Sequence, residues 1–470
     1  MTENYTKSII PDNESSGHGP DGNHTGIINP DSITGMIFAA EGIRGTVTLL
    51  NGPMGCKFYH STTSQFLIDH PPLYLPAGPG GKKTPVSYQF YDSWFFRQPR
   101  VPCTWLDGED YIYGTTGQIR AALKYLGENL DFSLLVLINA PGASLIGDSL
   151  EELAGDILPQ KRIIVLESPG YSESFCDGYS LAAAEILRQG FLPGWKNASA
   201  ETLPKDTASA GTRSVSVFGL SVWQRYYEGD REELIRLLEL MGIRVNCVMA
   251  AGCDTEEIGR IPESDLNIVL YPERGLPAAG MLQRELGIPY YVCEKLPVGF
   301  SAVERMAEEI AARLGTPAEP VLEESRRARA RAFSRIRPVH EISGLPEGVL
   351  FSIEGSRSEV FSYADFLQEY LGMIPDVLAV TEGEAGEDIL TVPERIRTAL
   401  RRNMADTSAE LVFGNANTIA MLKTRSKVFC GIEISNPGMG YTDFLPKTHL
   451  GIRGALFLTE QVINGLMSRL

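Results

Sequence analysis

The chain has 470 residues and a formal net charge of −17, with 43% hydrophobic and 21% charged residues. These proportions are ordinary for a globular protein, and the length predicts about three domains. The acidic balance argues against binding to nucleic acid or to an anionic membrane. The sequence contains no apolar stretch long enough to span a bilayer and its polar N-terminus lacks a signal core, so we expect a cytoplasmic protein.

The seven cysteines are widely spaced and form no Cys-x-x-Cys pair, a distribution that predicts reduced thiols and not a disulfide framework. Residues 1–27 are rich in Gly, Asn, Asp and Ser, and we expect them to form a flexible tail. From residue 28 onward, short apolar runs alternate with segments of helical periodicity. Runs of this kind are typical of strands that are buried on both faces of a parallel sheet.

Three units of alternating strands and helices follow one another along the chain. The first is expected to contain strands at 134–138 and 163–166 and helices at 116–126 and 181–188. The second is expected to contain strands at 215–218, 245–249 and 266–270 and helices at 230–241, 276–285 and 302–314, with a Pro-containing linker at 317–320. The third is expected to contain strands at 349–353, 377–380, 411–413 and 427–430 and helices at 359–371, 394–402, 416–424 and 454–467. The sequence therefore predicts an α/β protein with three doubly wound, Rossmann-like parallel-sheet domains in series, at residues 28–212, 213–318 and 319–470.

Two segments stand out by composition. Residues 70–102 are full of Pro, Gly and aromatic side chains, and they include GGKKT at 80–84. The first glycine of a phosphate-binding loop would fall at Pro76 and no buried strand leads in, so a partner-contacting surface is the better interpretation. The Arg-rich run 326–337 is interpreted as a solvated helix face or a linker, with contact to an acidic partner as the alternative.

A single cysteine follows a sharp turn in LLNGPMGCKFYH, residues 49–60. An apolar run ends in Asn51-Gly52-Pro53, a turn signal, and Gly55 then precedes Cys56. From the residues alone, Cys56 is a candidate iron-sulfur ligand, a candidate nucleophile or a small side chain that fills apolar space.

The element GPMGC resembles the Gly-Pro-x-Gly-Cys element that carries a cluster ligand in nitrogenase component 1. Further segments resemble that family in the same order: GEDYIYGTTGQIRAAL at 108–123, NAPGASLIGDSLEEL at 139–153, SPGYSESFCDGY at 168–179, GDREELIRLLELMGI at 229–243, LNIVLYPERGLPAAGMLQRELGIPY at 266–290 and THLGIRGALFLTEQVIN at 448–464. The last segment is most similar to the closing helix of the beta-type chain. The resemblance covers nearly the whole chain after the tail.

The departures from the family pattern concern the cluster ligands. Each chain of a family pair supplies three thiolates to a bridging cluster, but here Met36 and Ala140 stand at two of these positions and only Cys56 remains. One thiolate cannot hold a four-iron cluster. Either a partner chain supplies the other ligands in a three-plus-one site, or Cys103 or Cys176 joins Cys56, with Cys103 the first choice.

The catalytic metallocofactor site of the alpha-type chain is expected to be absent. Tyr271 stands where that chain has its cofactor-binding cysteine, and Leu450 stands where it has its histidine. Neither side chain suits a soft iron site. His449, one residue away, is expected to be a capping or surface residue, or to point inward if the register slips by one. Glu273 and Arg274 follow a predicted strand end and are expected to line a substrate pocket.

The resemblance implies a beta-type subunit of a nitrogenase-like, two-component oxidoreductase that works by electron transfer under anaerobic conditions. It implies an iron-sulfur cluster bound by Cys56 as the metal ligand, with Gly55 shaping the loop, and a heterotetramer with an alpha-type subunit. It also implies a separate ATP-dependent iron-sulfur reductase as the electron donor. Two alternatives are a non-catalytic scaffold on which a complex metallocluster is assembled, and a cluster-free structural partner subunit.

Overall fold

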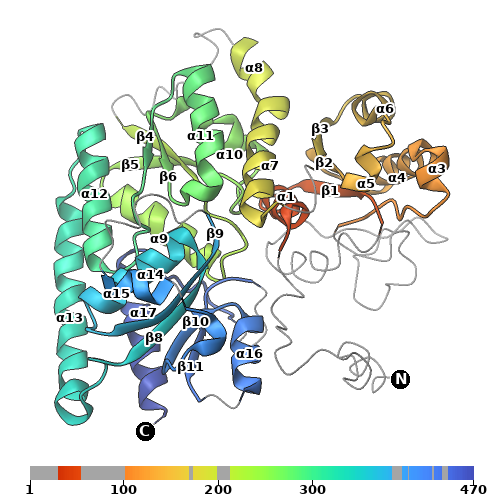
Figure 1. Cartoon of the computed structure of the whole chain (residues 1–470). Helices are drawn as coiled ribbons and strands as arrows, with labels where there is room; N and C mark the ends of the chain where they lie inside the picture. The colour runs from red at the N-terminus through yellow and green to blue at the C-terminus, as the bar shows by residue number, and fades with distance from the viewer. Residues whose placement is uncertain are drawn as a thin grey trace, which may run out of the picture.

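The computed structural model describes residues 30–53, 101–168, 173–197, 212–383, 394–400, 402–425, 428–436 and 443–469. In this part of the chain, three parallel sheets are each flanked by helices (Figure 1). One sheet falls within each of the three predicted segments, and the predicted α/β fold with three parallel-sheet units is therefore confirmed.

The first sheet has the order β1-β2-β3, with every pair parallel. Its strands are β1 (Thr46–Asn51), β2 (Leu134–Asn139) and β3 (Arg162–Glu167). Alternate residues of β2 face opposite cores: Leu135 and Leu137 pack with α4 (Thr116–Asn129) and α6 (Leu150–Ile157), whereas Val136 packs on the other side. Burial of both faces explains why β1 and β2 are continuously apolar in the sequence.

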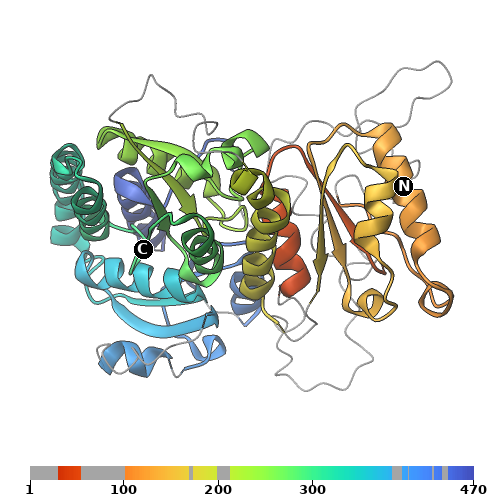
Figure 2. The same ribbon diagram turned by 90° about the horizontal axis from the view of Figure 1, so that it is seen from above.

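Two helices connect this first unit to the rest of the molecule. These are α1 (Ser32–Glu41) and α7 (Phe175–Gly190), which lie between the first sheet and the other two sheets (Figure 2). The two helices cross so closely that a Cβ atom at Gly35 would lie 2.0 Å from the carbonyl oxygen of Phe175. Glycine is therefore required at position 35 by backbone-to-backbone contact.

The second sheet has the order β5-β4-β6-β7 and the third has the order β11-β10-β8-β9, again with all pairs parallel. The second sheet contains β4 (Arg213–Phe218), β5 (Ile243–Val248), β6 (Leu266–Val269) and β7 (Tyr290–Val292). The third contains β8 (Leu350–Ser356), β9 (Ile374–Glu382), β10 (Leu411–Gly414) and β11 (Cys430–Glu433). Each chain path reverses direction once, between β4 and β6 and between β8 and β10. Doubly wound sheets bind ligands at such reversal points.

The second and third units share one hydrophobic core, so they pack as a single body. The helices that carry the following arguments are α3 (Asp110–Tyr113), α5 (Pro141–Ser144), α9 (Tyr227–Leu240), α11 (Pro272–Leu286), α14 (Arg357–Glu369), α16 (Ala416–Thr424) and α17 (Gly451–Met467). The remaining helices are α8 (Leu192–Asn197), α10 (Thr255–Gly259), α12 (Phe300–Leu314), α13 (Glu319–Ser343) and α15 (Glu394–Leu400).

Most predicted elements match the structure to within a few residues, and the differences have local causes. The Arg-rich run lies in α13, so the helix-face interpretation is confirmed, and this helix begins inside the predicted linker with Pro320 in its first turn, where proline is tolerated. Strand β11 starts at Cys430, three residues later than the predicted start; of the described residues 428–430, Cys430 is the one whose amide donates to the neighbouring strand end, at the Glu410 carbonyl. Within the described ranges, none of the helices combines the length and hydropathy of a membrane span.

Candidate functional site

The first site region is the base of the predicted cysteine loop, at the carboxyl end of β1. We call Asn51, Gly52, residues 102–104 and Asn139 the loop base. The segment 102–104 runs beside β1, because the Leu50 amide donates to the Pro102 carbonyl (2.9 Å) and the Thr104 amide donates to the Leu50 carbonyl (3.0 Å). Cys103 is therefore fixed next to β1 and is fully buried.

Polar side chains hold the loop base together. The Asn51 side chain donates to Asn139 Oδ1 (2.9 Å) and accepts from the Thr104 hydroxyl (2.9 Å), whose oxygen accepts in turn from the Gly52 amide (3.0 Å). Asn139 donates onward to Glu167 Oε2 (2.9 Å). Donors and acceptors in this network satisfy one another, as buried polar groups require.

The same network extends to the start of α4. Asp148 accepts from both the amide (2.8 Å) and the hydroxyl (2.6 Å) of Thr115, and the Thr115 hydroxyl lies 3.5 Å from Asn51 Nδ2. Burial raises the pKa of Asp148, but hydrogen bonds from Thr115 and Thr116 outweigh that effect and lower it below its ordinary value. Asp148 is thus an ionised anchor that ties α4 to the loop base.

The predicted ligand residues are placed differently by the structure. Cys56 and Gly55 lie outside the described residues, so their assignment stays a prediction. Cys103 lies at the loop base. Met36 and Ala140, at the two substituted positions, are fully buried in the same core, and a Cβ atom at Gly52 would lie 2.8 Å from Ala140 Cβ.

Cys176 belongs to a different environment from Cys103. It lies in the first turn of α7, and its thiol donates to Glu382 Oε2 in the third unit (2.7 Å). Burial, and then the Glu382 carboxylate, raise the pKa of the Cys176 thiol well above its ordinary value. Within the described residues, no three His, Cys, Asp or Glu side chains gather into a set that could hold a metal ion.

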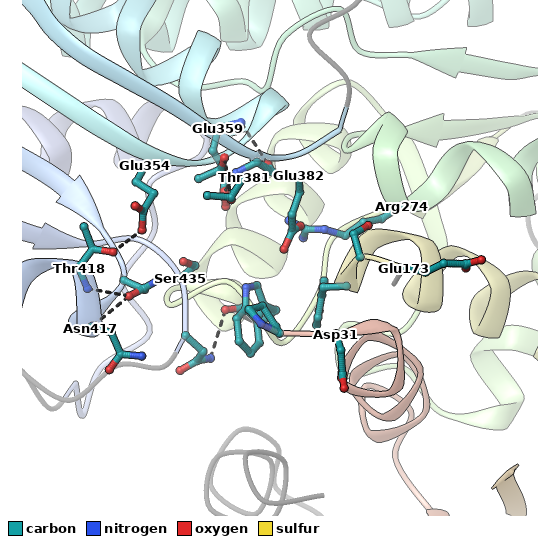
Figure 3. Close-up of a pocket in the computed structure, with 18 residues that line it drawn as sticks. Asp31, Glu173, Arg274, Glu354, Glu359, Thr381, Glu382, Asn417, Thr418 and Ser435 are labelled. Carbon is teal, nitrogen blue, oxygen red and sulfur yellow. Dashed lines mark hydrogen bonds between the residues drawn. The ribbon is translucent and has the colours of Figure 1, made fainter. Parts of the chain in front are cut away.

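The second site region is a cavity of about 510 Å³ where the three units meet (Figure 3). It lies at the carboxyl ends of β8, β9, β10 and β11, and thus includes the reversal point between β8 and β10. Its volume is typical of pockets that bind small organic molecules. The first unit contributes Pro30, Asp31, Glu173, Ser174 and Phe175, the second contributes Trp223 and Arg274, and the third contributes Glu354, Gly355, Ser356, Glu359, Thr381, Glu382, Asn415, Asn417, Thr418, Ser435 and Asn436.

Four helices begin at this cavity. Their N-cap residues, Asp31 of α1, Ser174 of α7, Ser356 of α14 and Asn415 of α16, all line its wall. Each of these side chains accepts a hydrogen bond from an amide in the first turn of its own helix. Because a helix N-terminus carries partial positive charge, the four helices make the electrostatic potential of the cavity more positive.

Arg274, in the first turn of α11, is the largest fully buried side chain of the described residues, with 1% of its surface exposed. Its guanidinium carbon lies 4.5 Å from the centroid of the Tyr271 ring, and its Nε and Nη1 groups have no hydrogen-bond partner. Figure 3 shows the side chain extending from α11 toward Glu382. Burial opposes its charge, but Cys176 and then Glu382 and Glu359 raise its pKa above the ordinary value, so Arg274 is a permanent cation.

Buried carboxyl groups of the cavity wall, unlike Arg274, are already hydrogen-bonded. Glu354 accepts from the Thr418 hydroxyl, and Glu359 accepts from the Ser356 amide (2.9 Å) and from Gln224 (3.2 Å). Glu382 accepts from Cys176, as described above. Burial raises the pKa of all three carboxyl groups.

The sequence identified part of this cavity. Arg274 lines it as expected, but Glu273 bonds to the amide and hydroxyl of Ser358 instead. The expectation that His449 is a capping or surface residue is wrong, because only 1% of it is exposed. Its ring bonds to Tyr363 (2.7 Å) and Gln461 (2.6 Å), and it does not line the cavity. Trp223 and Glu382 were missed, because neither lies in a recognisable motif.

The described residues form three α/β units in series, each built on a parallel sheet, and the predicted cysteine loop follows β1 of the first unit. The chain belongs to the nitrogenase component 1 type oxidoreductase family, whose family model matches residues 32–467. The expected family is therefore confirmed.

Curated relatives and solved structures agree with this membership. The B subunit of the light-independent protochlorophyllide reductase from Bradyrhizobium sp. (strain ORS 278) is 30% identical over 241 residues, which cover 51% of this chain and 44% of that protein. The protein of the same description from Methylocella silvestris is 28% identical over 225 residues, 48% of this chain and 42% of that protein. The matched region is thus less than half of each relative. The solved structure "Nitrogenase Cp1 at pH 6.5" shares the fold, with a TM-score of 0.69 and 16% identity over 94% of this chain and 93% of that chain.

Proposed function

We propose that this chain is the beta-type subunit of a nitrogenase-like two-component reductase, and that Cys56 is its ligand to an iron-sulfur cluster at the contact with an alpha-type partner. One observation carries the proposal: in a member of this family, β1 ends at the loop base, and Cys56 follows Gly52 by four residues. The hydrogen bonds of Asn51 and Thr104 hold the start of the loop in one orientation.

The donor set near the loop base agrees with a shared cluster. Thiolates are the preferred ligands of iron-sulfur clusters, and four are usual. Among the described residues, the loop base contains one thiol, Cys103. With Cys56 it makes two, so the remaining ligands come from the partner chain. The cluster would supply one-electron redox chemistry, and this chain would position it and limit its exposure to water.

An exposed apolar patch supports a protein contact on this side of the first unit. Ile112, Tyr113 and Leu145 expose 75%, 84% and 89% of their surfaces. They lie near one another, since Tyr111 of α3 packs against Gly142 of α5. Exposed apolar patches of this kind commonly mark protein interfaces. We assign this patch to the alpha-type partner or to the ATP-dependent iron-sulfur reductase that donates electrons.

The test is anaerobic purification of the complex formed by this chain and a co-expressed alpha-type chain, followed by measurement of iron and acid-labile sulfide. We expect Cys56→Ala to lower the iron content of the shared site at least about tenfold, because loss of a thiolate ligand removes both a bond and a compensating charge. The matched control is Cys430→Ala, which removes a half-buried thiol from β11 in the third unit.

The outcomes separate the proposal from its alternatives. Iron that depends on Cys56, with ATP-dependent reduction in the presence of the electron donor, supports the reductase. A cluster that depends on Cys56 but is transferred to an apo-enzyme identifies a scaffold. Full iron content in the Cys56→Ala complex, or no iron in the wild-type complex, contradicts the proposal and leaves a structural subunit.

A further inference from the structure

We propose that the cavity between the three units binds a small organic carboxylate, which pairs with the guanidinium of Arg274. This inference goes beyond the iron-sulfur role, because none of its residues belongs to the loop base. It places a ligand site within this one chain, at the reversal point of the third sheet.

The buried cavity wall has donors without partners, and this indicates that the ligand carries hydrogen-bond acceptors. The buried acceptors Glu354, Glu359 and Glu382 are each occupied by a donor from the protein. Two nitrogen atoms of Arg274, Nε and Nη1, have no hydrogen-bond partner. An unsatisfied buried charge is costly, and a group that is retained in that state is explained by a ligand that completes it. A carboxylate offers the planar pair of acceptors that a guanidinium binds best.

Charge at the cavity limits an anionic ligand to a single negative charge. The N-termini of α1, α7, α14 and α16 stabilise negative charge there, and Arg274 supplies one full positive charge. These contributions are opposed by the carboxyl groups of the wall, which belong to Asp31, Glu173, Glu354, Glu359 and Glu382. Glu359 and Glu382 lie close enough to influence Arg274 electrostatically, so a dianion such as phosphate would meet more repulsion than a monoanion. A monocarboxylate therefore fits the local charge better than a phosphate does.

The other residues that line the cavity indicate the shape and polarity of the rest of the ligand. Trp223 provides aromatic surface, and its ring is packed against the fully buried ring of Phe175, with centroids 4.8 Å apart. Asn417 and Ser435 provide an amide and a hydroxyl to the same wall. A planar body that carries a carboxylate at one end matches this arrangement, since aromatic faces stack on flat rings.

The test uses the full-length chain and isothermal titration calorimetry with 1-naphthoate as the probe and the neutral 1-naphthamide as its matched counterpart. We expect the wild-type chain to bind 1-naphthoate at least about tenfold more tightly than 1-naphthamide, because only the carboxylate forms charge-assisted hydrogen bonds. Arg274→Gln should remove that preference. The control Arg236→Gln changes an arginine of α9 that is paired with Glu233 and Glu324, and it should keep the preference.

A second variant keeps the test decisive if Arg274→Gln fails to fold. Asn417→Asp adds negative charge to the wall at the second position of α16, where helices favour an acidic side chain. We expect it to weaken 1-naphthoate binding by at least about threefold and to leave 1-naphthamide binding unchanged. No binding of 1-naphthoate, equal binding of the two probes, tighter binding of inorganic phosphate, or a preference that survives both variants overturns the proposal.

Discussion

The carboxyl edges of the first and third sheets occupy equivalent places in their folds but are built in opposite ways. At the edge of the first sheet, Asn51, Thr104 and Asn139 bond to one another and leave the network closed. At the edge of the third sheet, the acceptors are paired while Arg274 retains unpaired donors. Both edges contain buried polar groups, and they differ in whether all of the buried donors and acceptors have partners.

This difference distinguishes a set of polar residues that stabilises the backbone from a set that binds a ligand. A closed network gains nothing from a ligand, so its residues act on the backbone that they hold, here the start of the cysteine loop. An open set of donors has a free energy cost that binding can offset. The first edge should therefore matter most for stability, and the third edge most for affinity.

The largest effect is expected from opening the closed network. Asn51→Leu keeps the approximate size of the side chain but leaves Asn139 Oδ1 and the Thr104 hydroxyl without their partner. Two orphaned buried groups should destabilise the first unit by about 4 kcal/mol. Hydrogen exchange of peptides that cover β1 and β2 measures this local loss.

The control for this substitution is Asn129→Leu, at the C-terminal end of α4, whose side chain donates to the Tyr125 carbonyl and has no other hydrogen bond among the described residues. It should change exchange in β1 and β2 by less than about 1 kcal/mol. Equal protection of both strands in the wild type and in Asn51→Leu would show that the loop base is not a supporting network.

The fold could be predicted from the sequence because strands that are buried in a parallel sheet consist of short apolar runs. The runs at 134–138 and 215–218 coincide with β2 and β4 almost residue for residue. Prediction was less accurate where pairing and not composition sets the boundary, as at β11. The helix α1 was missed, since its residues are buried on all sides and show no amphipathic period.

The site could be predicted only where a motif marks it. Arg274 was found because it follows a strand end. Glu382 comes from the third unit and Trp223 from the segment that follows β4 of the second unit, and nothing in a linear sequence states that three units meet at one cavity. His449 was misplaced because a polar residue beside a helix start usually caps it or faces water. Its burial depends on Tyr363 and Gln461, which are 86 and 12 residues away.

A second closed network, around His449, lies in the same body as the cavity and provides the next test. Burial lowers the pKa of His449 to about 4 from the ordinary value of 6.5. The folded state therefore binds fewer protons than the unfolded state, so this contribution to stability is complete above pH 6.5 and is lost as the pH falls toward 4. Between about pH 7.5 and about pH 5, His449 should account for a loss of about 2 kcal/mol.

The measurement compares urea unfolding of the wild type and His449→Gln at both pH values. Burial raises the pKa of Asp230 to about 7, and this effect has the opposite sign, because the folded state then binds the extra proton. Asp230 is present in both proteins, so its contribution cancels in the difference. If the unfolding free energy depends on pH in the same way in both proteins, the folded state does not lower the pKa of His449.

The smallest change in stability is expected at Arg274, the residue on which the open edge depends. Arg225, by comparison, is paired with Glu433 and Asp443, and Arg225→Met should cost about 4 kcal/mol because the buried Glu433 carboxylate loses its counter-charge and the half-buried Asp443 keeps only Lys447. Arg274 has no ion pair of this kind among the described residues, and its contacts with the Tyr271 and Phe175 rings can be replaced by an apolar side chain.

Arg274→Met should therefore leave the unfolding free energy within about 1 kcal/mol of the wild type, because the lost ring contacts and the lost attraction of Glu359 and Glu382 are offset by removal of a buried guanidinium whose Nε and Nη1 groups are unsatisfied. Urea unfolding in the absence of any carboxylate measures this difference directly. A loss as large as that of Arg225→Met would mean that Arg274 is the structural counter-ion of Glu359 and Glu382. The two edges would then be built alike, both for stability. A near-neutral result would mean that the stability of the fold does not depend on the buried cation at position 274. Ligand binding would then account for the presence of that cation.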